Sequence, residues 1–231
     1  MAQEILTSKK LLSLEKRKKL NLPIYSTLEE VLNAVTHGIG ALLSIAAIVL
    51  LIVFSDFNPK TIACVTIYSA TLFLLYIVST LYHALAINKA KTVFRVLDHC
   101  SIFILILGTY TPVCLLMLNS TVGWVLFSTV LLAAIVGIVF NSIDLKKYSK
   151  FSMICYLAMS WVVIFAIKPL LMSVSSKQLI FFFLGGVAYT IGAVIYKIGK
   201  KVKYMHSVWH LFVLAGSILH FFMIFDFIKA H

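Results

Sequence analysis

The chain has 231 residues, of which 61% are hydrophobic and only 12% are charged, and its mean hydropathy is +1.03. A water-soluble domain carries about 25% charged residues, so this composition excludes an ordinary soluble fold. The formal net charge of +12 is compatible with a nucleic-acid-binding protein. The basic residues, however, lie in short clusters between long uncharged stretches, which is typical of a membrane protein, so we expect no nucleic-acid partner.

The chain begins with a basic segment, residues 1–27, which we predict to be a cytoplasmic tail separate from the rest of the fold. No short apolar stretch with a small-residue cleavage site follows its basic run, so it does not resemble a secretory signal. Residues 28–231 form the second predicted domain. They consist of apolar stretches interrupted by a few charged connections.

Each apolar stretch is long enough to cross a bilayer, because a spanning helix needs about 20 mostly apolar residues. These stretches are apolar almost all round, whereas helices of a soluble protein have one polar face. We therefore predict an all-α integral membrane protein, a seven-transmembrane helix bundle. The helices are expected at roughly residues 31–54, 61–86, 98–118, 122–141, 150–169, 178–197 and 205–227.

The basic residues are distributed unequally between the two sides of this bundle. Sixteen of the 20 lysines and arginines fall in the tail and in the second, fourth and sixth connections. The other four are Lys60, Lys168, Lys177 and Lys229. Because cytoplasmic loops carry the excess of Lys and Arg, we predict a cell-membrane protein with a cytoplasmic N-terminus and an external C-terminus. The basic loops are expected to meet anionic lipid headgroups.

Polar side chains gather at the predicted cytoplasmic ends of four helices. In chain order they are Glu30, Asn33 and His37, then Ser79 and His83, then Asp98, and finally His206 and His210. Scattered polar residues would fall at mixed depths. Ionisable residues inside a membrane are costly and mark functional sites, so this layer is the main functional signal of the sequence.

Three of these residues have the chemistry of metal ligands. His206 and His210 are spaced i, i+4, which places both rings on one face of a helix. With His83 they supply three imidazoles and leave a fourth position open, the pattern of a catalytic zinc site. We predict a Zn²⁺ ion on these three residues, with a bound water activated for attack.

The other polar residues are expected to assist this ion. Asp98 is predicted to accept a proton from the water or to orient it, and Ser79 to bind the water or a substrate carbonyl. Glu30, Asn33 and His37 are expected to fix the ligand rings. His220 shares a helical stripe with His210 but lies about 15 Å further along the axis, so we expect it to pack or to line a cavity.

Each assignment has a structural alternative. His206 could extend to lipid headgroups, and His83 could cap its helix. Asp98 could be a helix N-cap paired with Arg95, and Ser79 could bond to a carbonyl of its own helix. His37 could be an interhelical hydrogen-bonding residue.

The motifs resemble those of the bacterial hemolysin III family, which is related to the progestin and adipoQ receptors. The resemblance rests on the segment from Glu29 to Gly40 and on Ser79-Thr-Leu-Tyr-His83. It continues in Leu97-Asp98-His99 and in His206-Ser-Val-Trp-His210, and it covers nearly the whole chain after the tail. It implies a seven-helix fold with zinc on His83, His206 and His210, and with Asp98 and Ser79 at the metal-bound water.

The resemblance and the site together suggest a zinc-dependent hydrolase of an amide or ester bond in a membrane lipid. Two other functions stay open. One is a non-enzymatic membrane-homeostasis sensor or receptor-like protein with a structural zinc. The other is a cytolytic protein, as the family name implies, although a pore needs a polar stripe through the full bilayer and the outer half of the chain is nearly all apolar.

Overall fold

The fold was analysed in a computed structural model that describes residues 2–199 and 202–230. In this part of the chain, seven helical spans are long and apolar enough to cross a membrane, which confirms the predicted architecture. The spans are α2 (Thr27–Val53), α3 (Pro59–Ala84), α4 (Lys89–Pro112) continued by the π-helix η1 (Val113–Leu118), α5 (Thr121–Asp144), α6 (Ser149–Trp161) continued by the 3₁₀-helix η2 (Val162–Ala166) and α7 (Ile167–Ser173), α8 (Ser176–Gly199) and α9 (Met205–Ala230).

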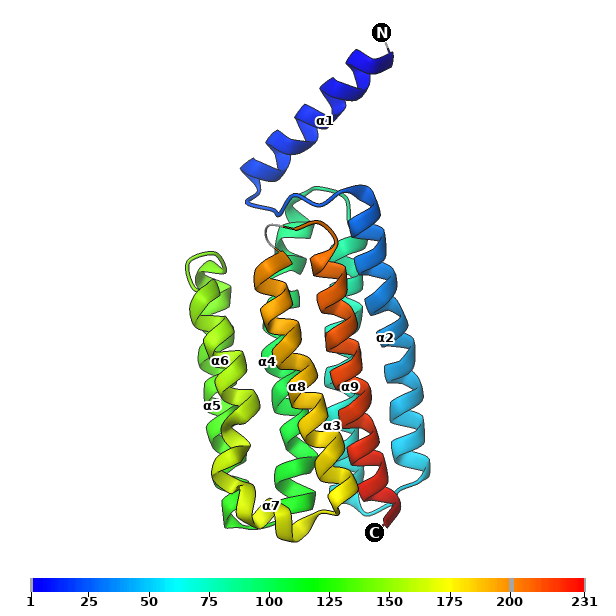
Figure 1. Ribbon diagram of the computed structural model, residues 1–231, viewed down its shortest axis with the longest axis vertical. Helices are drawn as coiled ribbons and strands as arrows, with labels where there is room; N and C mark the ends of the chain where they lie inside the picture. The colour runs from blue at the N-terminus through cyan, green and yellow to red at the C-terminus, as the bar shows by residue number, and fades with distance from the viewer. Residues whose placement is uncertain (1, 200–201, 231) are drawn as a thin grey trace.

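The spans alternate in direction, so the start of α2 and the starts of α4, α6 and α9 share one end of the bundle, at the top of Figure 1. We call this the histidine end. The tail and the basic connections all belong to it, although Lys200 and Lys201 of the sixth connection lie outside the described residues. Assignment of this end to the cytoplasm stays a prediction.

The largest boundary error is at the third span, where α4 begins at Lys89 rather than at residue 98. The side chain of Asn88 accepts a hydrogen bond from the Lys91 amide and caps the helix there. The uncharged stretch marks only the part of a helix inside the apolar layer, and this helix continues beyond it. Asp98 therefore lies inside α4 and is not an N-cap residue.

The fifth span is interrupted, which the apolar pattern did not predict. It runs as α6, then the 3₁₀ segment η2, then the short α7, which contains Pro169. Proline inside a helix lacks an amide donor and clashes with the carbonyl four residues earlier. That carbonyl belongs to Phe165 in η2, which explains the local change of helix type.

Helix α2 packs against both α3 and α9, and α9 packs in turn against α8 (Figure 1). Gly40 permits the close contact between α2 and α3, since a Cβ atom there would lie 2.5 Å from the ring of Tyr76. The Tyr76 hydroxyl reaches across to α9 and donates to Ser217 Oγ at 2.7 Å. These three helices therefore have a fixed spacing, and they carry the histidines.

Helix α1 (Ala2–Lys19) projects from the histidine end, and the chain then returns to the bundle before α2 (Figure 1). Leu22 is buried in this return and Arg17 is buried at the end of α1. The division between a tail and a membrane domain near residue 27 stays a prediction, but residues 17–25 do contact the bundle.

Candidate metal centre

Three histidines meet at the histidine end of the bundle. His83 lies in the last turn of α3, while His206 and His210 lie in the first two turns of α9. All three side chains are buried. One ring nitrogen from each lies within 4.8 Å of the other two, so the three residues could hold a metal ion.

The same ring nitrogen is free on each histidine. Nε2 of His83, His206 and His210 is buried and has no hydrogen-bond partner among the described residues. A buried polar atom without a partner costs about 1–3 kcal/mol, and three such atoms at one point need a common explanation. A shared cation is an electron-pair acceptor that satisfies all three.

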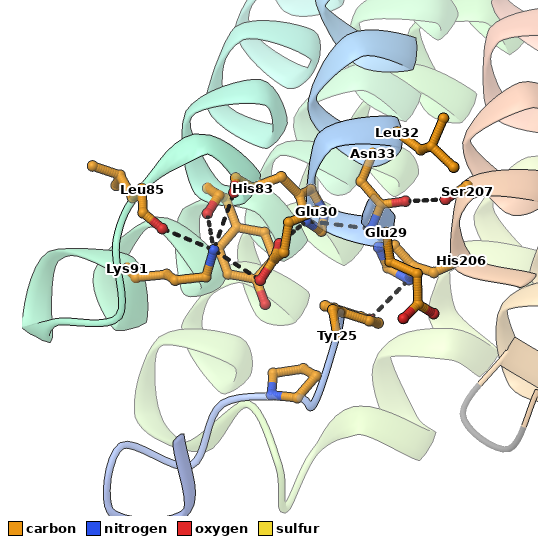
Figure 2. A network of polar contacts seen from close by, with 12 residues as sticks. Tyr25, Glu29, Glu30, Leu32, Asn33, His83, Leu85, Lys91, His206 and Ser207 are labelled. Atoms are coloured by element: carbon orange, nitrogen blue, oxygen red, sulfur yellow. Dashed lines mark hydrogen bonds and ion pairs between the residues drawn. The ribbon is translucent and has the colours of Figure 1, made fainter. Parts of the chain in front are cut away.

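The opposite nitrogen of His83 is held by a carboxylate. Glu30 Oε2 lies 2.8 Å from His83 Nδ1. A carboxylate accepts hydrogen bonds, so the proton lies on Nδ1 and leaves the Nε2 lone pair available for an ion. The other oxygen of Glu30 contacts two cations, Arg17 Nη2 at 3.0 Å and Lys91 Nζ at 3.1 Å. Figure 2 shows Glu30 between Lys91 and His83.

The two histidines of α9 are held from α2 and from the segment before it. His210 Nδ1 lies 3.2 Å from the backbone carbonyl of Asn33 and 3.3 Å from Thr36 Oγ1. The carbonyl can only accept, so His210 also carries its proton on Nδ1. His206 Nδ1 lies 3.1 Å from the hydroxyl of Tyr25. Asn33 is itself held, because Ser207 Oγ donates to its Oδ1 (Figure 2).

His37 contacts the cluster in a different way. Its ring stacks on His210, with centroids 3.5 Å apart and an interplanar angle of 11°. Neither of its ring nitrogens has a hydrogen-bond partner among the described residues. His37 therefore supports a candidate ligand by ring packing rather than by the hydrogen bond that its alternative interpretation predicted.

Ser79 and Asp98 lie beside the histidines. Ser79 is one turn before His83 on α3, and its buried hydroxyl makes no hydrogen bond to a carbonyl of its own helix. The structure thus does not support the alternative in which it bonds to its own helix. Asp98 is buried on α4 and interacts electrostatically with His83 and Ser79. Their catalytic roles stay predictions, but the structure brings both to the candidate site.

A cavity of about 130 Å³ extends from this layer into the bundle between α4, α6, α8 and α9. Asp98 and His37 line it near the metal centre, and Thr109 and His220 line it deeper. Most other lining side chains are apolar. His220 thus lines a cavity, as one of its two expected roles required, and its Nε2 donates to the Phe182 carbonyl at 3.1 Å.

Sequence reasoning missed four residues that support the centre: Arg17, Tyr25, Thr36 and Lys91. The two cations were counted only as charges of the tail and of a basic loop. Lys91 is in fact among the most buried side chains of the protein. Thr36 follows Asn33 by one helical turn, which was a usable signal, but nothing in the sequence placed Tyr25 against a histidine 181 residues later.

Comparison with known proteins agrees with this geometry. Residues 25–221 match the family model described as haemolysin-III related. The chain is 40% identical to Hemolysin-3 of Bacillus cereus over 85% of its length and 90% of the relative. It is 41% identical to the Hemolysin-3 homolog of Bacillus subtilis (strain 168), over 87% and 95% of the two chains. A more distant relative, the monocyte to macrophage differentiation factor of Homo sapiens, is 26% identical over 87% of this chain and 84% of its own. With seven membrane-spanning helices and a match over most of its length, this chain belongs to the haemolysin III-related family of multi-pass membrane proteins.

Proposed function

We propose that this protein is a zinc-dependent hydrolase that cleaves an amide or ester bond of a membrane lipid near the cytoplasmic face. The observation that supports it best is the convergence of three buried Nε2 atoms that lack partners. Two of the rings, His83 and His210, are fixed in the tautomer that a metal ligand requires.

The donor set fits zinc better than a hard cation. Three neutral imidazoles suit Zn²⁺, whereas Ca²⁺ and Mg²⁺ prefer oxygen ligands. Structural zinc sites are usually closed by four protein ligands, while catalytic sites have three and an open position. When bound, zinc would lower the pKa of a coordinated water to about 7, so that a hydroxide nucleophile is available at neutral pH. Proton transfer and binding of the substrate carbonyl are assigned to side chains of the protein.

Asp98 is the candidate proton acceptor, because its carboxylate is buried within interaction range of His83 and Ser79. Ser79 has a buried hydroxyl beside the Asp98 carboxylate and is the candidate donor to the carbonyl oxygen of the scissile bond. Hydrolysis adds water across that bond, giving a carboxylic acid and an amine or alcohol. Asp98 returns the proton to the leaving group, as a general acid–base residue does.

The cavity supports a lipid as the substrate. It is mostly apolar and begins at Asp98, next to the metal centre. An acyl chain placed there would leave its polar bond beside the candidate catalytic residues. Sites of this kind, apolar with a few convergent polar groups, are typical of small-molecule binding.

Metal analysis of the detergent-purified protein tests the proposal first. We expect one zinc per chain in the wild type and loss of zinc in His83→Ala, His206→Ala and His210→Ala. His220→Ala is the matched control, since this buried histidine lies outside the cluster, and it should retain the metal. Wild-type protein without stoichiometric zinc would contradict the proposal.

Comparison of membrane lipids tests the reaction. Cells that produce the wild type should lose one lipid class and gain its acid and amine or alcohol products. The Asp98→Asn variant should retain zinc without this turnover. If zinc is present but lipids are identical between wild type and His206→Ala, the ion is structural and the sensor or receptor-like alternative is favoured.

A further inference from the structure

The segment that joins α1 to α2 has a defined shape. Two backbone hydrogen bonds close the C-terminal end of helix α1. The Asn21 amide donates to the Lys18 carbonyl, and the Leu22 amide donates to the Arg17 carbonyl. This is a Schellman cap, which needs a left-handed residue at Asn21, and its φ is 57°. The cap turns the chain back over the bundle. We call residues 17–25 the N-terminal strap.

The middle of the strap and the residues that follow it are fixed. Leu22 is buried, and the Asn21 carbonyl accepts a hydrogen bond from Arg95 of α4. Immediately after the strap, Ser26 and Glu29 form a reciprocal capping box that starts α2. Glu29 also accepts from the Tyr204 amide, just before α9. The strap is therefore attached to α4 through Asn21, and it leads directly into the capped start of α2, which is itself joined to the residue before α9.

The strap reaches two of the three candidate ligands. Tyr25 contacts His206 directly, through its hydroxyl at 3.1 Å and through its ring, whose centroid lies 5.0 Å from the imidazole. The same ring lies 5.9 Å from His83. In Figure 2 Tyr25 lies at the end of the strap and points toward His206.

Arg17 reaches the second ligand through one intermediate. Its Nη2 donates to Glu30 Oε1, and Glu30 Oε2 holds His83 Nδ1. Its Nη1 donates to the Pro23 carbonyl at 2.7 Å, so the guanidinium also ties the strap to itself. The Arg17 side chain is 9% exposed and that of Glu30 11%. This pair is buried, unlike a screened surface ion pair.

The strap and the cavity are made of different residues around the metal centre. The cavity is lined mainly by α4, α6, α8 and α9, with His37 of α2 and Leu75 of α3, and none of the strap residues line it. The strap lies at the histidine end, where the chain returns from α1 (Figure 1).

We infer that the N-terminal strap is a working part of the metal centre: Arg17 and Tyr25 are positioning residues that hold His83 and His206, and the strap is a lid that slows exchange of the ion with the aqueous phase. This inference rests on the zinc site of the proposed function. It assigns the closure of the aqueous side to the segment before the first membrane span. The cavity then forms the other approach to the centre, from within the bundle.

Release of zinc to an excess of a water-soluble chelator tests the inference on the full-length, zinc-loaded protein in detergent. Partners that orient metal ligands typically change metal affinity by about 10–100-fold. We therefore expect zinc release from Tyr25→Phe and Arg17→Gln to be faster than wild type by roughly that factor. Tyr25→Phe keeps the ring and removes only the hydroxyl, so its fold should be preserved.

Two matched variants control for nonspecific effects. Tyr204→Phe changes an exposed tyrosine at the same end, and Lys18→Gln removes an exposed cation beside Arg17. Both should release zinc at the wild-type rate. Arg17→Lys keeps a positive charge beside Glu30, so it should release zinc more slowly than Arg17→Gln does. Visible spectra of the Co²⁺-substituted proteins give a second readout, which Tyr25→Phe should shift and Tyr204→Phe should not.

The two proposals fail in distinguishable ways. A wild type without zinc overturns the metal site itself. A wild type that holds zinc, with release rates and Co²⁺ spectra of Tyr25→Phe and Arg17→Gln equal to those of the controls, overturns the role of the strap alone. If Arg17→Gln does not fold, Tyr25→Phe and Arg17→Lys still decide the question.

Discussion

Glu30 and His83 are separated by 53 positions in the sequence, yet Glu30 Oε2 and His83 Nδ1 lie 2.8 Å apart. The carboxylate belongs to the first membrane span and the imidazole to the second. The other carboxylate oxygen of Glu30 is contacted by Arg17 and Lys91. One buried anion thus compensates two cations and orients one candidate metal ligand, so its substitution should affect both stability and metal binding.

Glu30→Gln is expected to be strongly destabilising. Removal of one partner from a buried ion pair costs about 3–5 kcal/mol, because the remaining charge is left uncompensated. Here Arg17 and Lys91 would both lose their anion. Zinc affinity should fall by about 10–100-fold, since His83 loses the group that holds its ring. Thermal unfolding in detergent and competition with a chelator measure the two effects.

Asp226→Asn is the control for Glu30→Gln. Asp226 pairs with Lys177 at the opposite end of the bundle, where the lysine side chain is 65% exposed. Exposed pairs contribute about 0–1 kcal/mol, so this variant should unfold near the wild-type temperature and bind zinc normally. Equal effects of the two substitutions would contradict the importance assigned to Glu30.

Lys91→Met should destabilise the protein even though it replaces a charged residue with an apolar one. Lys91 Nζ donates to the carbonyls of Tyr82, His83 and Leu85, where α3 ends and its carbonyls lack helical partners. The substitution leaves those carbonyls unsatisfied and removes one of the two cations beside Glu30, and we expect a loss of about 3–5 kcal/mol. Denaturant unfolding in detergent measures it.

Lys89→Met gives the comparison for that result. Lys89 is exposed, two residues earlier in the same helix. Surface substitutions away from special features usually change stability by less than about 0.5 kcal/mol. The assignment of Lys91 as a C-terminal cap of α3 is wrong if both methionine variants unfold at the same denaturant concentration.

The sequence predicted the seven spans because each apolar stretch has the length of a bilayer. It also predicted that His83, His206 and His210 lie at one depth, because alternating helix directions place these helix ends in one layer. It did not predict the start of α4, because the helix continues into the charged zone where hydropathy carries no signal. There Asn88 and not composition decides the boundary.

The parts of the site that were missed depend on tertiary packing. Lys91 and Arg17 have the composition of membrane-surface residues, and only the fold buries them against Glu30. Tyr25 lies outside any predicted helix, and its contact with His206 depends on the turn at Asn21. Such contacts follow from the path of a connecting segment, which neither hydrophobic periodicity nor charge asymmetry specifies.

Two glycines on one helix should respond oppositely to alanine. A Cβ atom at Gly40 would lie 2.5 Å from the Tyr76 ring, whereas at Gly38 the nearest side-chain atom is 3.8 Å away. We expect Gly40→Ala to cost about 1–3 kcal/mol through overpacking. Gly38→Ala should be neutral or stabilising by up to about 1 kcal/mol, because alanine favours the helix. Thermal unfolding of the pair checks the contact between α2 and α3.

Removal of the metal should lower stability reversibly. Without an ion, the three Nε2 atoms stay buried and unsatisfied, at about 1–3 kcal/mol each. We expect a chelator to lower the melting temperature of the wild type, and added Zn²⁺ but not Mg²⁺ to restore it. A melting temperature unchanged by chelation, in protein shown to have lost its zinc, would contradict this expectation.

The cavity offers a way to separate lipid turnover from metal binding. Ile106 lines it on α4, away from the three histidines. Ile106→Trp should fill part of the volume, retain zinc and lose lipid turnover, at an overpacking cost of about 1–3 kcal/mol. Ile135→Trp on α5 changes a side chain that is 50% exposed on the outer surface of the bundle, and both its zinc content and its lipid turnover should match the wild type. Undiminished turnover by Ile106→Trp would show that the substrate reaches Asp98 by another route, and the side of the centre covered by Tyr25 would then be the route to test.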